Sequence, residues 1–138
     1  MKTNDEIMAY NGRLDNIDRI TSSISKILES SQPLQQSVPQ LINTFNNLMS
    51  EQMHLNNQLA QLELLMRNNL EKFKEIVSGA EKRLDRNLDS IDRWTELLLS
   101  RDLGSMDINE MNAQQMILKA IEDANDRFNN ELDRLYSL

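Results

Sequence analysis

The chain has 138 residues, a length typical of one domain, and its 15 Lys and Arg against 22 Asp and Glu give a formal net charge of −7. This acidic balance argues against binding the nucleic-acid backbone or an anionic membrane surface through bulk charge. The absence of cysteine excludes disulfides and thiol chemistry, and no apolar run approaches the ~20 residues that cross a bilayer. We therefore expect a soluble, cytoplasmic protein, although export by a non-classical route is also compatible with this composition.

A first helix is predicted over residues 4–30. Thr3 and Glu6 have the spacing of a capping box, and Pro33 follows the predicted end of the helix. Apolar positions recur every three or four residues, which places them on one helical face: Ile7, Tyr10, Leu14, Ile17, Thr21, Ile24 and Leu28.

A second, much longer helix is predicted over residues 38–101. Ser37 and Gln40 again have capping-box spacing, and Pro39 would occupy the first turn, where its missing N–H costs nothing. Unbroken, this helix would be roughly 100 Å long at ~1.5 Å per residue. Its apolar seam comprises Val38, Leu41, Phe45, Leu48, Gln52, Leu55, Leu59, Leu62, Met66, Leu70, Phe73, Val77, Ala80, Leu84, Leu88, Ile91, Trp94 and Leu98.

A third helix is predicted over residues 108–137, after a loop that contains Gly104. Asp107 and Glu110 form the third capping-box pattern. The predicted stripe consists of Met111, Gln115, Leu118, Ile121, Asn125, Phe128, Leu132 and Leu135.

These elements predict an all-α fold in a single helical domain over residues 1–138. Because short loops make consecutive helices antiparallel neighbours, the two shorter helices would flank the long central one in a coiled-coil or helical-bundle assembly. The alternative is an up-down four-helix bundle in which the long helix breaks at Gly79. The related segments 14–20 and 88–94 indicate either a duplicated hairpin or chance similarity between amphipathic helices.

The first half of the long helix is our candidate for self-association. Glu51 is the sole formal charge between Ser31 and Leu62, where Gln and Asn take the polar positions. Depletion of charge is typical of interface cores, and a polar residue in the seam can fix register, although an uncharged solvent-facing surface would show the same composition. The predicted interface with another copy comprises Phe45, Leu48, Gln52, Leu55, Leu59, Leu62 and Met66.

The third helix carries a net charge of −4 from seven acidic and three basic residues. It could lie across Lys82, Arg83 and Arg86, which we favour, or offer its acidic face to a basic partner. The candidate partner face combines residues around the second loop and on this helix: Trp94, Met106, Met111, Glu122, Asp123 and Asp126. A core role is the favoured interpretation for Trp94.

No pattern of catalytic residues is present. His54 is the single histidine, the three glycines are far apart, and no serine lies in a nucleophile elbow. We therefore predict no catalytic, cofactor-binding or metal-ligating residues, and a protein that is not an enzyme.

The leading functional hypothesis is a non-enzymatic helical coiled-coil protein that mediates self-association and protein–protein assembly. It would form a homo-oligomer and bind a further protein, but neither nucleic acid nor membrane. The alternatives are a small acidic inhibitor or chaperone of one larger protein, and an exported or virion structural component. The residues show no resemblance to a known family.

Overall fold

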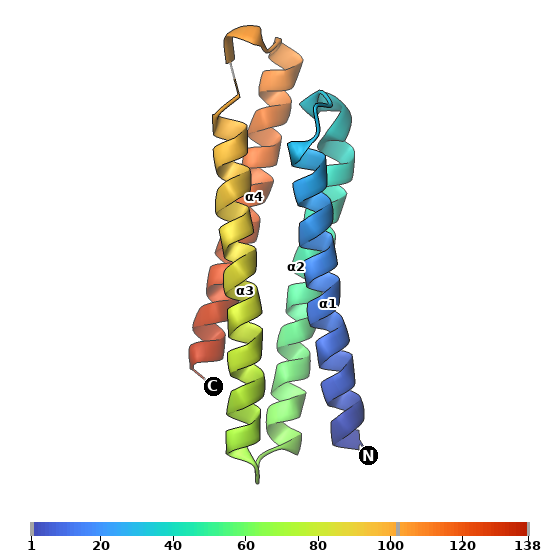
Figure 1. Cartoon of the computed structure of the whole chain (residues 1–138), viewed down its shortest axis with the longest axis vertical. Coiled ribbons are helices and arrows are strands. Elements are labelled where there is room, and N and C mark those ends of the chain that lie inside the picture. Colours follow the sequence, from blue (N-terminus) through green and yellow to red (C-terminus); the bar gives the residue numbers. More distant parts are fainter. Residues whose placement is uncertain (1, 102, 138) are drawn as a thin grey trace.

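The structure, a computed structural model that describes residues 2–101 and 103–137, is an all-α bundle (Figure 1). Its helices are α1 (Lys2–Glu29), α2 (Leu34–Leu65), α3 (Leu70–Leu99) and α4 (Ile108–Tyr136), with a short 3-10 helix, η1 (Leu103–Ser105), before α4. The predicted helical bundle is confirmed. The first and third predicted helices agree with α1 and α4 to within two residues at each end.

The predicted continuous helix over residues 38–101 is wrong, and so is the alternative break at Gly79. The chain turns between α2 and α3 over Met66–Asn69, and Gly79 lies inside α3. The Met66 N–H still donates to the Leu62 carbonyl at 2.8 Å, and the Asn69 side chain then accepts from the Lys72 N–H at 3.3 Å. An asparagine cap therefore starts a new helix, whereas an exposed Gly within a helix costs only about 1 kcal/mol relative to Ala.

Two of the three predicted capping boxes are also wrong. Thr3 lies within α1, and Ser37 is buried inside α2, which starts one turn earlier at Leu34. Burial of the Leu34 side chain explains the earlier start, since it adds apolar contact that a helix beginning at Ser37 would lack. The third prediction is confirmed, because the Asp107 carboxylate caps α4 by accepting from the Glu110 N–H at 2.8 Å.

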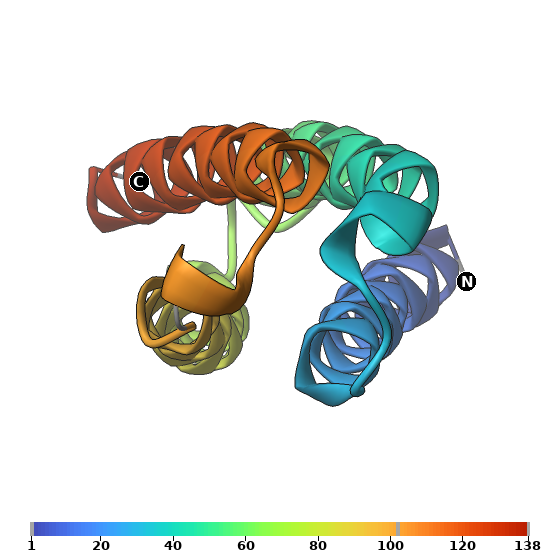
Figure 2. The same ribbon diagram turned by 90° about the horizontal axis from the view of Figure 1, so that it is seen from above.

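The four helices form two hairpins that lie side by side. Viewed from above, the order around the bundle is α1, α2, α4, α3 (Figure 2). The predicted antiparallel packing of consecutive helices holds within the hairpins α1–α2 and α3–α4. It fails for α2 and α3, which sit on opposite corners and make few contacts, so the turn Met66–Asn69 crosses the end of the bundle.

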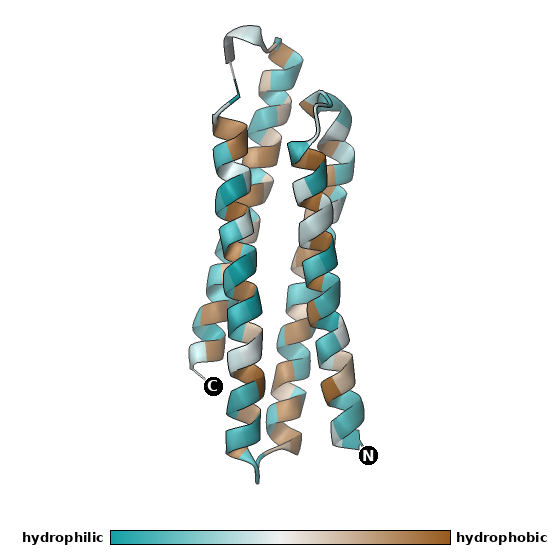
Figure 3. Ribbon diagram, in the orientation of Figure 1, coloured by the Kyte–Doolittle hydropathy of each residue, from teal (hydrophilic) through white to brown (hydrophobic). Residues whose placement is uncertain are grey.

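The core consists of one stripe from each helix. Apolar and polar bands alternate along every helix (Figure 3), as expected when one face is buried. Trp94 and Phe45 pack edge to face at the centre, with ring centroids 5.7 Å apart and both side chains at most 1% exposed. The core role favoured for Trp94 is therefore confirmed.

The predicted stripe of α4 is out of phase at its beginning. Met111 and Gln115 are exposed, and α4 instead buries Ala113, Gln114 and Ile117. The Gln114 side chain donates to the Leu98 carbonyl of α3 at 2.7 Å. A buried amide with a partner is well tolerated, and hydrophobic periodicity alone does not reveal it.

Candidate protein-binding cleft

Polar contacts join the two hairpins along the seam between α1 and α3. The Arg83 guanidinium binds the carboxylates of Asp15, at 2.6 Å, and Asp18. The Trp94 indole N–H donates to the Ser25 hydroxyl at 2.7 Å, and the Tyr10 hydroxyl donates to the Ile76 carbonyl at 2.8 Å. Burial raises the pKa of the Tyr10 hydroxyl, with Arg83 nearby opposing the rise. Ion pairs and hydrogen bonds therefore join α1 to α3 along this seam.

We predicted that the third helix lies across Lys82, Arg83 and Arg86. The contacts of Arg83 contradict this prediction. Arg83 faces α1, and Arg93 of α3 also pairs with α1, through Glu29 at 2.5 Å. Within residues 2–101 and 103–137, none of the four ion pairs involves a residue of α4. The acidic side chains of α4 thus lack ion-pair partners within the described chain.

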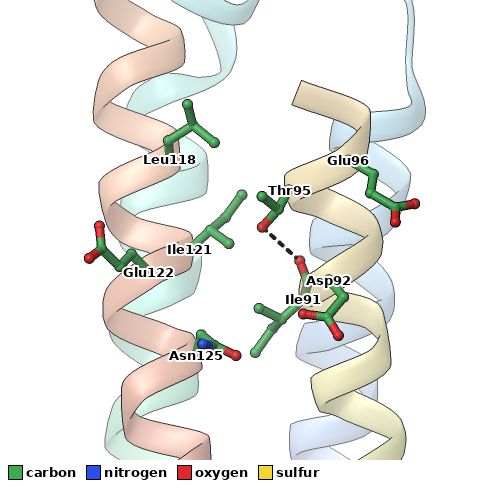
Figure 4. A pocket seen from close by; sticks show the side chains of 8 residues that line it. All are labelled: Ile91, Asp92, Thr95, Glu96, Leu118, Ile121, Glu122 and Asn125. Carbon is green, nitrogen blue, oxygen red and sulfur yellow. Dashed lines mark hydrogen bonds between the residues drawn. The ribbon is translucent and has the colours of Figure 1, made fainter. Parts of the chain in front are cut away.

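A hollow of about 560 Å³ lies between α3 and α4. Ile91 and Ile121 reach into the gap between the two helices, and Glu96 and Glu122 extend to its outer sides (Figure 4). Eight residues line it: Ile91, Asp92, Thr95, Glu96, Leu118, Ile121, Glu122 and Asn125. We call this hollow the α3–α4 cleft.

The α3–α4 cleft combines an apolar floor with acidic edges. Ile91 and Ile121 are buried and Leu118 is half-buried, whereas the carboxylates of Asp92, Glu96 and Glu122 are exposed. No lining residue is basic. The Thr95 hydroxyl donates to the Ile91 carbonyl of its own helix at 3.1 Å, so that bond is internal to α3 (Figure 4). Leu118 is therefore the apolar lining side chain that stays partly accessible, and the carboxylates at the rim can attract cations.

The structure does not bring the six residues of the predicted partner face together. Trp94 is fully buried, while Met106 is half-buried and Met111 is 41% exposed near the turn before α4. Glu122 lines the α3–α4 cleft, and Asp126 is exposed one turn further along α4. Asp123 lines a different groove, between α2 and α4.

The half of the cleft that α3 contributes was not among the predicted site residues, although the sequence carries a signal for it. Asp92 and Glu96 are four residues apart, so they lie on the same helical face. Two like charges at this spacing destabilise a helix slightly, and a partner cation would relieve that repulsion. The pair was therefore a usable signal in the sequence.

The seven residues of the predicted self-association interface are buried within a single chain. Their side chains are at most 4% exposed: Phe45, Leu48, Gln52, Leu55, Leu59, Leu62 and Met66. Helices of the same chain cover this seam, so it does not by itself require a second copy. By contrast, amides on the outer side of α2 are exposed, among them Gln40, Asn43 and Asn57.

The residues that the structure describes include no group of three or more His, Cys, Asp or Glu side chains that could hold a metal ion. No helix among them is long and apolar enough to span a membrane. His54 is exposed on α2.

Comparison with known proteins finds no matching family model, no matching curated protein and no matching solved structure.

Proposed function

We propose that this chain is a non-enzymatic assembly module that joins copies of itself to a second protein, which docks in the α3–α4 cleft. The observation that carries the proposal is the combination of a hollow in which Leu118 is partly accessible with three exposed carboxylates that have no ion-pair partner in the described chain. We also propose that it works in the cytoplasm.

The chemistry of the cleft favours a basic, amphipathic helical segment as the docked element. A helix lying along the groove between α3 and α4 would bury apolar side chains against the half-buried Leu118. Its Lys and Arg side chains would extend their aliphatic stems along the floor and place their charges beside Asp92, Glu96 and Glu122. Charge complementarity of this kind speeds association and fixes the orientation of the partner.

A small acidic inhibitor or chaperone that occupies one larger protein is the second candidate function. The same cleft would serve it, and the net charge of −7 would steer it toward a basic target. The two functions differ in whether the chain also associates with itself.

Charge reversal in the cleft tests the proposal. The double variant Asp92→Lys/Glu122→Lys removes two rim carboxylates that make no ion pair within the described residues. We expect its affinity for the partner captured from the native host to fall roughly tenfold or more, because like charges would then meet at the rim. Titration calorimetry with the purified partner measures this.

The matched control is Asp5→Lys/Asp133→Lys, which makes the same change in net charge at two exposed positions outside the cleft. It should keep most of the affinity and show the same helicity as the cleft variant. Equal loss in both variants would mean that net charge, rather than the cleft, governs binding. Unchanged binding in the cleft variant would place the partner on another surface.

A further inference from the structure

The turn between α2 and α3 has no residue that demands a turn. Met66, Arg67, Asn68 and Asn69 include neither Gly nor Pro, and no described residue has a positive φ. Met66 and Arg67 are good helix formers. Two hydrogen bonds of Asn69 define the turn. Its N–H donates to the Met66 carbonyl at 2.8 Å, and its side chain caps α3. We call this segment, residues 66–69, the hinge.

The apolar seam continues through the hinge in steps of three or four residues, although the two consecutive four-residue steps from Leu62 to Met66 and from Met66 to Leu70 shift its phase. Met66 and Phe73 are 4% exposed, but Leu70 between them is 57% exposed. Leu64 and Leu65 are also exposed beside the hinge, at 64% and 38%. Leu64 and Leu70 line a hollow of about 250 Å³ there. The closed chain therefore leaves apolar surface in water where a straight helix would keep one continuous stripe.

The packing order allows α2 and α3 to straighten. They occupy opposite corners of the bundle and make few contacts with each other, so straightening the hinge breaks little between them (Figure 2). Each hairpin would then lose its packing contacts with the other hairpin of the same chain. A second copy that opens in the same way offers identical hairpins, and every helix pair of the closed bundle can form again between copies.

We propose that two copies exchange hairpins and form an intertwined dimer. In this dimer α2 and α3 join into one helix, and the α1–α2 hairpin of each copy packs on the α3–α4 hairpin of the other. Two such helices run past each other in opposite directions and bring both hinges to the centre. Leu64, Leu65 and Leu70 of both copies then lie close together around that centre. This inference deepens the self-association part of the proposed function and rests only on that part.

Hinge variants test the exchange in the full chain. Asn69→Ala removes the cap that favours the turn and adds a helix former, so the dimerisation constant should rise about fivefold for each hinge, or roughly 25-fold in all. Leu70→Pro puts proline at the first residue of α3, where the closed form tolerates it, but inside the joined helix, which it would break. That variant should remain monomeric.

Matched controls come from the start of α4. Asp107→Ala removes an equivalent cap, and Ile108→Pro puts proline at an equivalent, exposed first residue. Neither should change the dimerisation constant, which is measured by analytical ultracentrifugation after refolding at high protein concentration. If every variant, including Asn69→Ala, stays monomeric, the exchange is overturned. It is also overturned if the chain dimerises and Leu70→Pro does not abolish that dimer.

Cross-linking distinguishes exchange from contact between closed bundles. Glu29 of α1 pairs with Arg93 of α3, and the chain has no cysteine, so Glu29→Cys and Arg93→Cys each introduce a single thiol. When the two variants are refolded together, a short bis-maleimide linker should join one to the other. A dimer that yields no such mixed product would refute the exchange but leave self-association itself standing. A strict monomer whose cleft still binds a partner would refute the exchange and leave partner binding intact.

Discussion

At the scale of single residues, Gln52 is the clearest departure from a well-satisfied core. Its side chain is 1% exposed, and neither its amide nitrogen nor its amide oxygen has a hydrogen-bond partner in the structure. Burying such a group without partners costs free energy that an apolar side chain of similar size would not. The sequence placed Gln52 in the seam, and the burial confirms that position.

Replacing this amide should stabilise the protein. We expect Gln52→Leu to raise the free energy of unfolding by about 1–3 kcal/mol, because it removes the desolvation cost of two unpaired polar atoms. Urea unfolding followed by circular dichroism measures the change. The control Gln61→Leu lies on the same helix at an exposed position and should alter stability by less than about 0.5 kcal/mol. A loss of stability in Gln52→Leu would mean that the amide makes contacts that the closed bundle does not show.

At the scale of elements, the seam between α1 and α3 holds the two hairpins together with polar groups. The Arg83 guanidinium binds two carboxylates of α1, and its side chain is only 23% exposed. A partly buried guanidinium that binds two carboxylates contributes more to the free energy of unfolding than an isolated surface ion pair usually does.

Removing Arg83 should therefore weaken the seam measurably. We expect Arg83→Ala to lower the free energy of unfolding by about 1 kcal/mol at low salt, and most of this difference should disappear near 1 M salt, where the screening length is about 3 Å. Chemical denaturation at the two salt concentrations provides the measurement. Arg86→Ala, at an exposed position on the same helix, is the control and should change stability little. A salt-independent loss would indicate packing of the Arg83 stem instead of charge pairing.

The elements themselves were largely predictable, and the exceptions have physical causes. Periodicity identified nearly all the buried faces, and the Asp107 cap located the start of α4 to the residue. The break at Met66–Asn69 was missed because the segment contains no Gly or Pro and Met66 and Arg67 favour a helix, and the phase change of the seam after Met66 was taken as a shift within one helix. Gly79, the expected weak point, stays helical because its neighbours on α3, such as Ala80 and Leu84, are buried in the core.

At the scale of the whole molecule, the sequence predicted the neighbours within each hairpin but not how the two hairpins pack on each other. A stripe shows which face is buried, but it does not show which helix covers it. The diagonal placement of α2 and α3 follows from how the two hairpin faces fit together. The acidic half of the α3–α4 cleft on α3 was missed although the pairing of these two helices was predicted, because periodicity does not show that Asp92 and Glu122 line one hollow.

If the bundle is two hairpins that cover each other, the covalent link between them should be dispensable. We therefore expect fragments 1–68 and 69–138, produced separately, to be weakly helical alone, because each would expose half of the core, including Phe45 or Trp94. Mixed, they should form a complex of one copy each with the helicity of the intact chain. Circular dichroism and ultracentrifugation measure both properties. A chain divided after Gly79 interrupts α3 inside the core and is the control, which should recover less helicity. Stable, fully helical fragments that ignore each other would show instead that each hairpin folds independently, and the mutual covering of the two hairpins would then have to be abandoned as the basis of the fold.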